Sequence, residues 1–222
     1  VGLVGSEMCI RDSKKTCLIK MVNKIGTDMN KKALVTIANG SEEIEVVSII
    51  DILRRAGVEV TVATCNLSSD MEIIAAQGTK IVAETSIDNC VNTEWDLIAI
   101  PGGVEGSNAL AESKLLTQLL QRQVTKGKFY AAICAAPALV LGSKGLLDNK
   151  TATCHPHFYQ VIEAKEVDTE SRVVVDGNCI TSQGPGTAIE FALELVEQLC
   201  GIVKREEVAS PLVLTTLPTA YY

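Results

Sequence analysis

The feature that most constrains the fold of this chain is a regular alternation of short apolar strands with helices from residue 31 onward. Strands are predicted at 33–38, 58–64, 95–100, 129–133 and 151–154, and helices at 42–56, 108–125, from 135, at 158–164 and at 188–200. Two hairpins are also expected, at 71–83 and at 172–181. This order predicts an α/β fold with a doubly wound, mostly parallel central sheet.

The chain organisation predicts one domain preceded by a leader. The chain has 222 residues, which is enough for one substantial core, and it contains no internal repeat and no linker. Residues 1–30 lack an amphipathic period, and we expect a disordered or non-native leader there, with 31–222 forming the domain. The basic stretch 14–24 is a weak hint of organelle targeting.

Charge and cysteine content exclude several classes of protein. The net charge is −7 with no basic cluster, so neither nucleic acid nor an anionic membrane is expected as a partner. No apolar run approaches the roughly 18 residues of a membrane span. The eight cysteines are scattered and form no C-x-x-C pair, which indicates a reducing, cytoplasmic setting without structural disulfides.

Cys134 stands where the strand 129–133 meets the next helix. Small residues surround it, and Pro137 lies in the first turn of that helix, where a missing N–H is harmless. The unpaired N–H groups of a helix N-terminus favour thiolate over thiol, so this position resembles a nucleophile elbow with sulfur in place of oxygen. The alternative is a buried cysteine that only fills space.

Parallel sheets place their functional sites at the carboxyl ends of the strands. In this chain those ends carry Gly40-Ser41, Pro101-Gly102-Gly103, Cys134 and His155. Ser41 is expected to cap the first helix. A thiol, backbone donors, a histidine and nearby carboxylates are therefore predicted to share one edge of the sheet.

Glu45 lies one turn into the first helix, among apolar neighbours. A buried carboxyl there would have a raised pKa and could stay protonated near neutrality, so that it donates a hydrogen bond to a thiolate or shuttles a proton. The alternative is that Glu45, like Glu42 and Glu43, only complements the helix dipole.

Backbone donors are the second expected component of the site. Pro101-Gly102-Gly103 could expose N–H groups which, with the N–H of Ala135, would form an oxyanion hole; otherwise it is an ordinary turn. The chain has neither a G-x-G-x-x-G motif after a strand nor a Walker A sequence, and we expect no cofactor.

His155 and His157 are the only histidines. With Cys154 they resemble part of a metal site, but no second cluster supplies further ligands, so no metal is expected. His155 is a candidate base or orienting group near Cys134. The alternative is a structural hydrogen bond at a strand end.

Together these segments resemble the ThiJ/PfpI superfamily, specifically its DJ-one (Parkinsonism-associated protein deglycase) branch, including the bacterial YajL type. The resemblance runs from about residue 31 to the end and rests on five segments, which occur in the family's order and at its spacing: Ala38-Asn39-Gly40-Ser41-Glu42-Glu43-Ile44-Glu45, Pro101-Gly102-Gly103, Ala131-Ala132-Ile133-Cys134-Ala135-Ala136-Pro137, His155-Pro156 and Thr181-Ser182-Gln183-Gly184-Pro185-Gly186-Thr187.

The resemblance implies a flavodoxin-like sandwich and a homodimer. It places the reactive cysteine at Cys134, its protonated partner at Glu45 and the nearby histidine at His155. It also assigns the oxyanion N–H groups to Gly103 and Ala135. Gln183 stands where some relatives carry an arginine that faces the pocket, which puts an anion-binding role at this position in doubt.

Three functions remain open on these residues. The resemblance implies a cofactor-free glyoxalase or deglycase, in which Cys134 attacks the carbonyl of methylglyoxal or of an early glycation adduct. The same thiol could instead serve a redox-sensing chaperone through oxidation to sulfinate. A cysteine protease is the third reading, and it lacks a clear Asn or Asp to orient His155.

Overall fold

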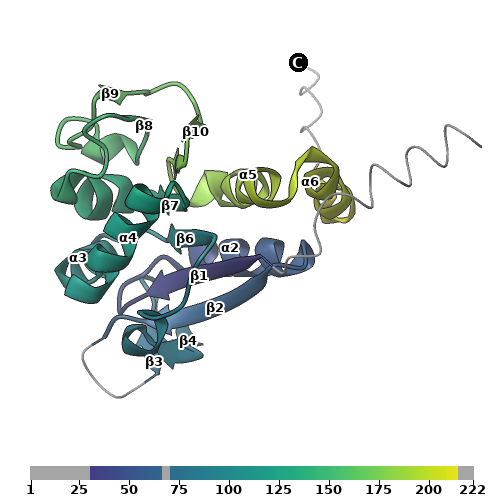
Figure 1. The fold of residues 1–222 in the computed structure, drawn as a ribbon, viewed down its shortest axis with the longest axis horizontal. Helices are drawn as coiled ribbons and strands as arrows, with labels where there is room; N and C mark the ends of the chain where they lie inside the picture. Colours follow the sequence, from purple (N-terminus) through teal and green to yellow (C-terminus); the bar gives the residue numbers. More distant parts are fainter. Residues whose placement is uncertain (1–30, 67–70, 215–222) are drawn as a thin grey trace, which may run out of the picture. The chain divides into compact units, whose positions relative to one another are not determined.

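The computed structural model describes residues 31–66 and 71–214 (Figure 1). The predicted leader, residues 1–30, lies outside these described residues, so its boundary stays a prediction. The described part contains no helix that is long and apolar enough to cross a membrane.

A seven-stranded sheet forms the centre of the fold, in the order β10-β11-β7-β6-β1-β2-β5. All neighbouring strands pair in parallel except β10 and β11, which form an antiparallel hairpin. The strands are β1 (Lys32–Ile37), β2 (Glu59–Thr64), β5 (Thr85–Ser86), β6 (Leu97–Ile100), β7 (Phe129–Ile133), β10 (Val173–Asp176) and β11 (Cys179–Ser182). The predicted mostly parallel sheet is thus confirmed.

Two small sheets accompany the central one. β3 (Glu72–Ile74) and β4 (Lys80–Val82) pair as the predicted antiparallel hairpin. β8 (Thr151–Ala152) pairs in parallel with β9 (Glu166–Val167), a partner that the sequence pattern did not indicate.

Five α-helices and several short turns of helix complete the described fold. The α-helices are α2 (Glu43–Arg55), α3 (Val104–Glu112), α4 (Lys114–Lys126), α5 (Ala188–Cys200) and α6 (Ile202–Ala209), the last two drawn in yellow-green in Figure 1. Of the short turns, η2 (Pro137–Leu141) is π-helical, whereas η4 (Pro156–Phe158) and η5 (Pro185–Thr187) are 3-10 helices.

The alternation of side chains along the strands explains the layers. In β1, Ala33, Val35 and Ile37 belong to a core cluster shared with α2 and α5, whereas Leu34 belongs to a second cluster with α3 and α4. Because successive strand residues point to opposite faces, each face of the sheet is covered by its own pair of helices. This is the doubly wound, single-domain architecture that the sequence predicted.

Several predicted helices differ from the structure. The helix expected at 108–125 is two helices, since Ser113 ends α3 and caps α4 by accepting a hydrogen bond from the N–H of Leu116. The helix expected at 158–164 is wrong, because only the η4 turn forms there. Ser41 does not cap α2; its Oγ accepts a hydrogen bond from the N–H of Ala38 instead.

The parallel arrangement brings three of the four expected strand ends to one edge of the sheet. Gly40 follows β1, Pro101 follows β6 and Cys134 follows β7, and these strands are neighbours in the sheet. The fourth expectation is wrong, because the strand before His155 is β8, which pairs with β9 in a separate two-stranded sheet. Gln183, which was not expected at this edge, follows β11 beside β7. The carboxyl edge of the sheet is therefore where the candidate site residues can meet.

Candidate active site

Cys134 adopts a left-handed backbone conformation directly after β7. Its φ is +66°, and among the described non-glycine residues only Val213 also has a positive φ. Two hydrogen bonds hold this conformation: the N–H of Cys134 donates to the carbonyl oxygen of Ser182 (3.0 Å), and the N–H of His155 donates to the carbonyl oxygen of Cys134 (2.8 Å). Such a conformation costs about 1–2 kcal/mol and persists only where neighbours impose it, often at functional sites.

The exposure of Cys134 also distinguishes it. All six cysteines in the described part of the chain are free thiols, and four of them are buried. Only Cys134 and Cys200 are partly exposed, and only Cys134 stands at a strand-to-helix junction. Among the described thiols, Cys134 thus combines access from solvent with a constrained position.

Glu45 is fully buried in the first turn of α2, and it lies beside Cys134. Its Oε2 accepts a hydrogen bond of 2.6 Å from the N–H of Gly102, while its buried Oε1 accepts none from any described residue. Burial, with a smaller contribution from the charge of Glu42, raises the pKa of Glu45 to about 8. The carboxyl is therefore protonated at neutral pH and can donate a hydrogen bond.

Gly102 lies between the side chains of Cys134 and Glu45. A Cβ atom at this position would lie 2.4 Å from Cβ of Cys134 and 2.9 Å from Oε2 of Glu45. These separations are shorter than any normal van der Waals contact, so only glycine fits here. The sequence indicated Pro101-Gly102-Gly103 as a donor loop, but not that the N–H of Gly102 serves Glu45.

Gly103 and Ala135 supply the remaining donors. The backbone N–H groups of both residues act on the Cys134 sulfur and lower its pKa. Gly103 has a φ of +83°, and a Cβ there would lie 2.1 Å from the carbonyl oxygen of Gly40, so the loop passes too close to β1 for any side chain. The structure thus brings both predicted oxyanion donors to the sulfur of Cys134.

The ionisation of Cys134 differs from the sequence expectation. Burial, followed by the charge of an ionised Glu45, raises the pKa of the thiol to about 12, and this outweighs the two N–H donors. A simple helix N-terminus therefore does not produce a resting thiolate. Below pH 8, however, Glu45 keeps its proton, which removes its repulsion of a thiolate and leaves a hydrogen-bond donor beside the sulfur.

His155 is joined to Cys134 through the backbone, not through its ring. Its Nδ1 accepts a hydrogen bond of 3.3 Å from the N–H of His157, and its ring packs against Gly184. Burial and the neighbouring His157 lower its pKa, which keeps the imidazole neutral at pH 7. No carboxylate in the described residues bonds to this ring, so the triad that a cysteine protease needs is not formed there.

Metal binding gains no support from the described residues, where no group of three or more His, Cys, Asp or Glu side chains could hold an ion. Cys154, the nearest thiol to His155 in the sequence, is buried in the core cluster shared with α3 and α4. It therefore cannot join His155 and His157 in an exposed site.

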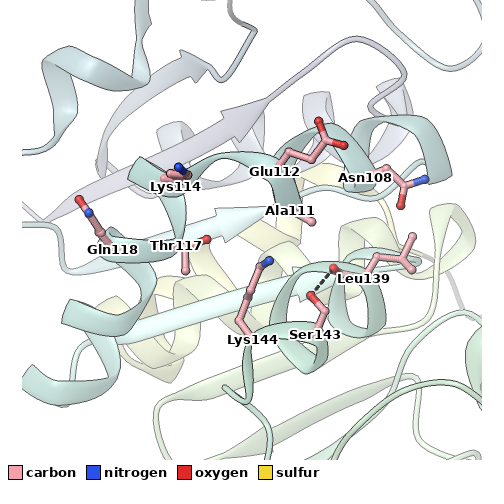
Figure 2. Close-up of a pocket in the computed structure, with 9 residues that line it drawn as sticks. All are labelled: Asn108, Ala111, Glu112, Lys114, Thr117, Gln118, Leu139, Ser143 and Lys144. Carbon is pink, nitrogen blue, oxygen red and sulfur yellow. Dashed lines mark hydrogen bonds between the residues drawn. The ribbon is translucent and has the colours of Figure 1, made fainter.

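Two sizeable cavities lie elsewhere on the domain. One, of about 850 Å³, is lined by residues of α3, α4 and the segment 139–144 (Figure 2). The other, of about 1030 Å³, is lined mainly by residues that follow β1 and β2 and by the junction of α3 and α4. Neither is lined by Cys134, Glu45 or His155, so the candidate site is identified by its chemistry.

The titration of Glu45 has a consequence for stability that can be measured. Its pKa in the folded protein, about 8, lies above the ordinary value of 4.5. The stabilising contribution of this carboxyl is therefore complete below the ordinary value and is lost as the pH rises towards 8, a change on the order of 4 kcal/mol. We expect Glu45→Gln to remove this slope when the free energy of unfolding is measured by urea denaturation across that range.

The matched control for this experiment is Glu112→Gln, which makes the same change at an exposed carboxyl. This variant is expected to keep the slope of the original protein. An equal pH dependence in the original protein and in Glu45→Gln would contradict the raised pKa of Glu45.

The fold and the site together define a class: a parallel α/β protein with a strained cysteine at a strand-to-helix elbow and a protonated glutamate beside it. A family model, the DJ-1/PfpI family, matches residues 31–198. The chain belongs to this family, within its DJ-1 branch.

Three relatives illustrate the similarity. The chain is 44% identical to Arabidopsis thaliana protein DJ-1 homolog B over 192 residues, which are 86% of this chain but 43% of that protein. The crystal structure of Drosophila melanogaster DJ-1beta matches with a TM-score of 0.80 at 41% identity, covering 84% of this chain and 100% of that one. Caenorhabditis elegans glutathione-independent glyoxalase DJR-1.2 is 37% identical, covering 83% of this chain and 97% of that protein. The chain therefore spans less than half of the plant relative.

Proposed function

We propose that the protein is a cysteine-dependent, cofactor-free glyoxalase that converts methylglyoxal to lactate, with Cys134 as nucleophile. The observation that carries this proposal is the buried, protonated Glu45 beside a constrained, partly exposed thiol that faces two backbone donors. It is supported by the 37% identity with the Caenorhabditis elegans relative, which is named a glutathione-independent glyoxalase.

The proposed reaction begins when the Cys134 thiol loses its proton to solvent and the thiolate adds to the aldehyde carbon, which forms a hemithioacetal. The N–H groups of Gly103 and Ala135 stabilise the oxyanion, and Glu45 then protonates it. The resulting carboxylate of Glu45 takes the proton from the former aldehyde carbon, and the neighbouring carbonyl carbon gains one, which leaves a thioester of lactate. Water hydrolyses this thioester to lactate and restores the thiol, so methylglyoxal and water account for all atoms.

His155 is proposed as a secondary group in this scheme. Its backbone N–H bonds to the carbonyl oxygen of Cys134, and Nε2 of its neutral imidazole could move a proton to or from water during thioester hydrolysis. The same addition of the thiolate to a carbonyl carbon would begin the removal of early glycation adducts from proteins and nucleotides. We propose this deglycase activity in addition to the glyoxalase activity.

The direct test is to incubate the purified protein with methylglyoxal in the presence of a metal chelator and without glutathione, and to follow lactate by NMR. We expect lactate to appear in proportion to protein concentration, because every proposed group belongs to the chain. Lactate no higher than in a protein-free blank would refute the glyoxalase proposal.

The alternative is a redox-sensing role with little turnover. It is favoured by the partial exposure of Cys134 among mostly buried thiols and by the proton on Glu45, which could donate to a sulfinate oxygen. Intact mass and peptide mapping after mild peroxide treatment test this role. Oxidation spread evenly over the cysteines would argue against it.

We also propose that the protein forms a homodimer. On α2, Ile44 and Val47 are 54% and 56% exposed and lie one turn apart, which leaves an apolar stripe on the surface of the single chain. Light scattering coupled to gel filtration tests this, and a mass that stays at 23.7 kDa would contradict it.

A further inference from the structure

Two separate segments hold the backbone of Cys134. On one side, β11 ends at Ser182, whose carbonyl oxygen accepts the hydrogen bond from the N–H of Cys134. On the other side, the segment that starts at His155 donates its first N–H to the carbonyl oxygen of Cys134. The reactive residue is therefore placed between these two segments.

Side chains join the same two segments a short distance further along. Nε2 of Gln183, the residue after Ser182, donates a hydrogen bond of 3.1 Å to Oη of Tyr159. Oη of Tyr159 in turn donates to the carbonyl oxygen of Thr169 at 3.2 Å, and Nε2 of Gln183 also approaches that oxygen at 3.5 Å. We call this arrangement of Gln183, Tyr159 and the Thr169 carbonyl the latch.

Both side chains of the latch come from residues close to His155, one along the chain and one beside its ring. Tyr159 lies four residues after His155, just beyond the η4 turn, whose first N–H groups bond back to His155. The imidazole ring packs on Gly184, which directly follows Gln183, at a distance that leaves little room: a Cβ there would lie 3.3 Å from Cδ2. A change at the latch is therefore transmitted to the position of this ring.

The latch consists of uncharged groups; Tyr159 and Gln183 are half-buried, and Thr169 is exposed. It offers no fixed charge that would hold an anionic substrate, and its hydrogen bonds tie down a segment, 155–169, that otherwise contains only one short 3-10 turn and two residues of strand. Hydrogen bonds across such a segment restrict its local opening.

We propose that Gln183 and Tyr159 are positioning residues that influence the specificity of the site: the latch holds His155 in place and makes Cys134 react faster with small, uncharged carbonyl compounds than with bulky or charged adducts. This inference rests on the proposed glyoxalase function for its kinetic consequences, but not for its structural ones. It predicts that free 2-oxoaldehydes are better substrates than bulky adducts.

The kinetic test uses Gln183→Leu, which removes the amide, and Tyr159→Phe, which keeps the ring and removes the hydroxyl. Methylglyoxal is compared with the bulkier phenylglyoxal. We expect kcat for methylglyoxal to fall about threefold to tenfold, as His155 loses its position, while KM for phenylglyoxal falls as access widens. The effect of the double variant is expected to be smaller than the sum of the two single effects, since both changes break the hydrogen bond between Gln183 and Tyr159, while each also removes its own contact with the Thr169 carbonyl oxygen.

A second measurement does not require turnover. Peptide mapping gives the rate at which Cys134 is modified by small iodoacetamide and by bulky pyrenyl maleimide. We expect both latch variants to raise the maleimide rate relative to the iodoacetamide rate at least threefold or so. The control, Gln160→Leu, makes the same kind of change at an exposed neighbour and is expected to leave the ratio unaltered.

The two measurements separate the two proposals. A raised modification ratio in both variants supports the latch even if no variant, nor the original protein, produces lactate. An unchanged ratio in both variants overturns the latch, whether or not the protein is a glyoxalase. Additive kinetic effects in the double variant would likewise contradict a shared hydrogen bond.

Discussion

Replacing Cys134 with serine is expected to lower the rate of lactate formation from methylglyoxal at least about a thousandfold. A hydroxyl is a far weaker nucleophile than a thiol at neutral pH, and the protonated Glu45 beside it cannot act as its base. Serine is close in size to cysteine and keeps both backbone hydrogen bonds at this position, so the fold should persist. Initial rates by NMR and a circular dichroism spectrum give the two readouts.

The control for this substitution is Cys200→Ser at the end of α5, which changes the other partly exposed thiol among the described residues. It is expected to retain full activity. Turnover of Cys134→Ser within tenfold of the original protein would show that another group is the nucleophile.

The strands and the elbow could be predicted because local sequence determines them. Each of the longer buried strands is a short apolar run, and these runs predicted β1, β2, β6 and β7 to within a few residues. The edge strand β5, which has two residues and no apolar run, was not predicted. Cys134 was recognisable because small residues and Pro137 surround it, a local requirement of the tight turn.

Other parts of the fold depend on contacts that are distant in sequence. The helix expected at 158–164 does not form, because this segment is held by bonds to residues elsewhere, such as that between Tyr159 and Gln183. α6 was not predicted either; its single buried residue, Val208, gives almost no apolar period, and it packs against α5. Tertiary contacts here override local preference.

The electrostatics of the site also needed the structure. Position in the helix suggested that Glu45 holds a proton, and its complete burial now gives the physical cause. The same reasoning at Cys134 favoured a thiolate, but it considered only the helix N-terminus. Burial of the sulfur and its closeness to Glu45 arise from residues 89 positions apart, which no local pattern reveals.

Gly102→Ala is the second substitution from which we expect a large effect. The new methyl group would lie 2.4 Å from Cβ of Cys134, 2.9 Å from Oε2 of Glu45 and 2.9 Å from the carbonyl oxygen of Ile133, so all three must move. Overpacking of this kind costs about 1–3 kcal/mol in the free energy of unfolding. Movement of Oε2 would also break its 2.6 Å hydrogen bond from the N–H of Gly102. We therefore expect a loss of activity of about a hundredfold or more, because the geometry between acid and thiol changes.

Gly186→Ala provides the matched control for that change. Gly186 is exposed in the turn before α5, and a Cβ there meets no atom within 4 Å. The same chemical change should leave stability and turnover nearly unaltered at this position. Urea denaturation, lactate formation and the alkylation rate of Cys134 are measured for both variants. If Gly102→Ala matched Gly186→Ala in all three, the close approach of Cys134 and Glu45 across Gly102 would not be what holds the site together. A loss of Cys134 reactivity confined to Gly102→Ala is the result that the contact requires.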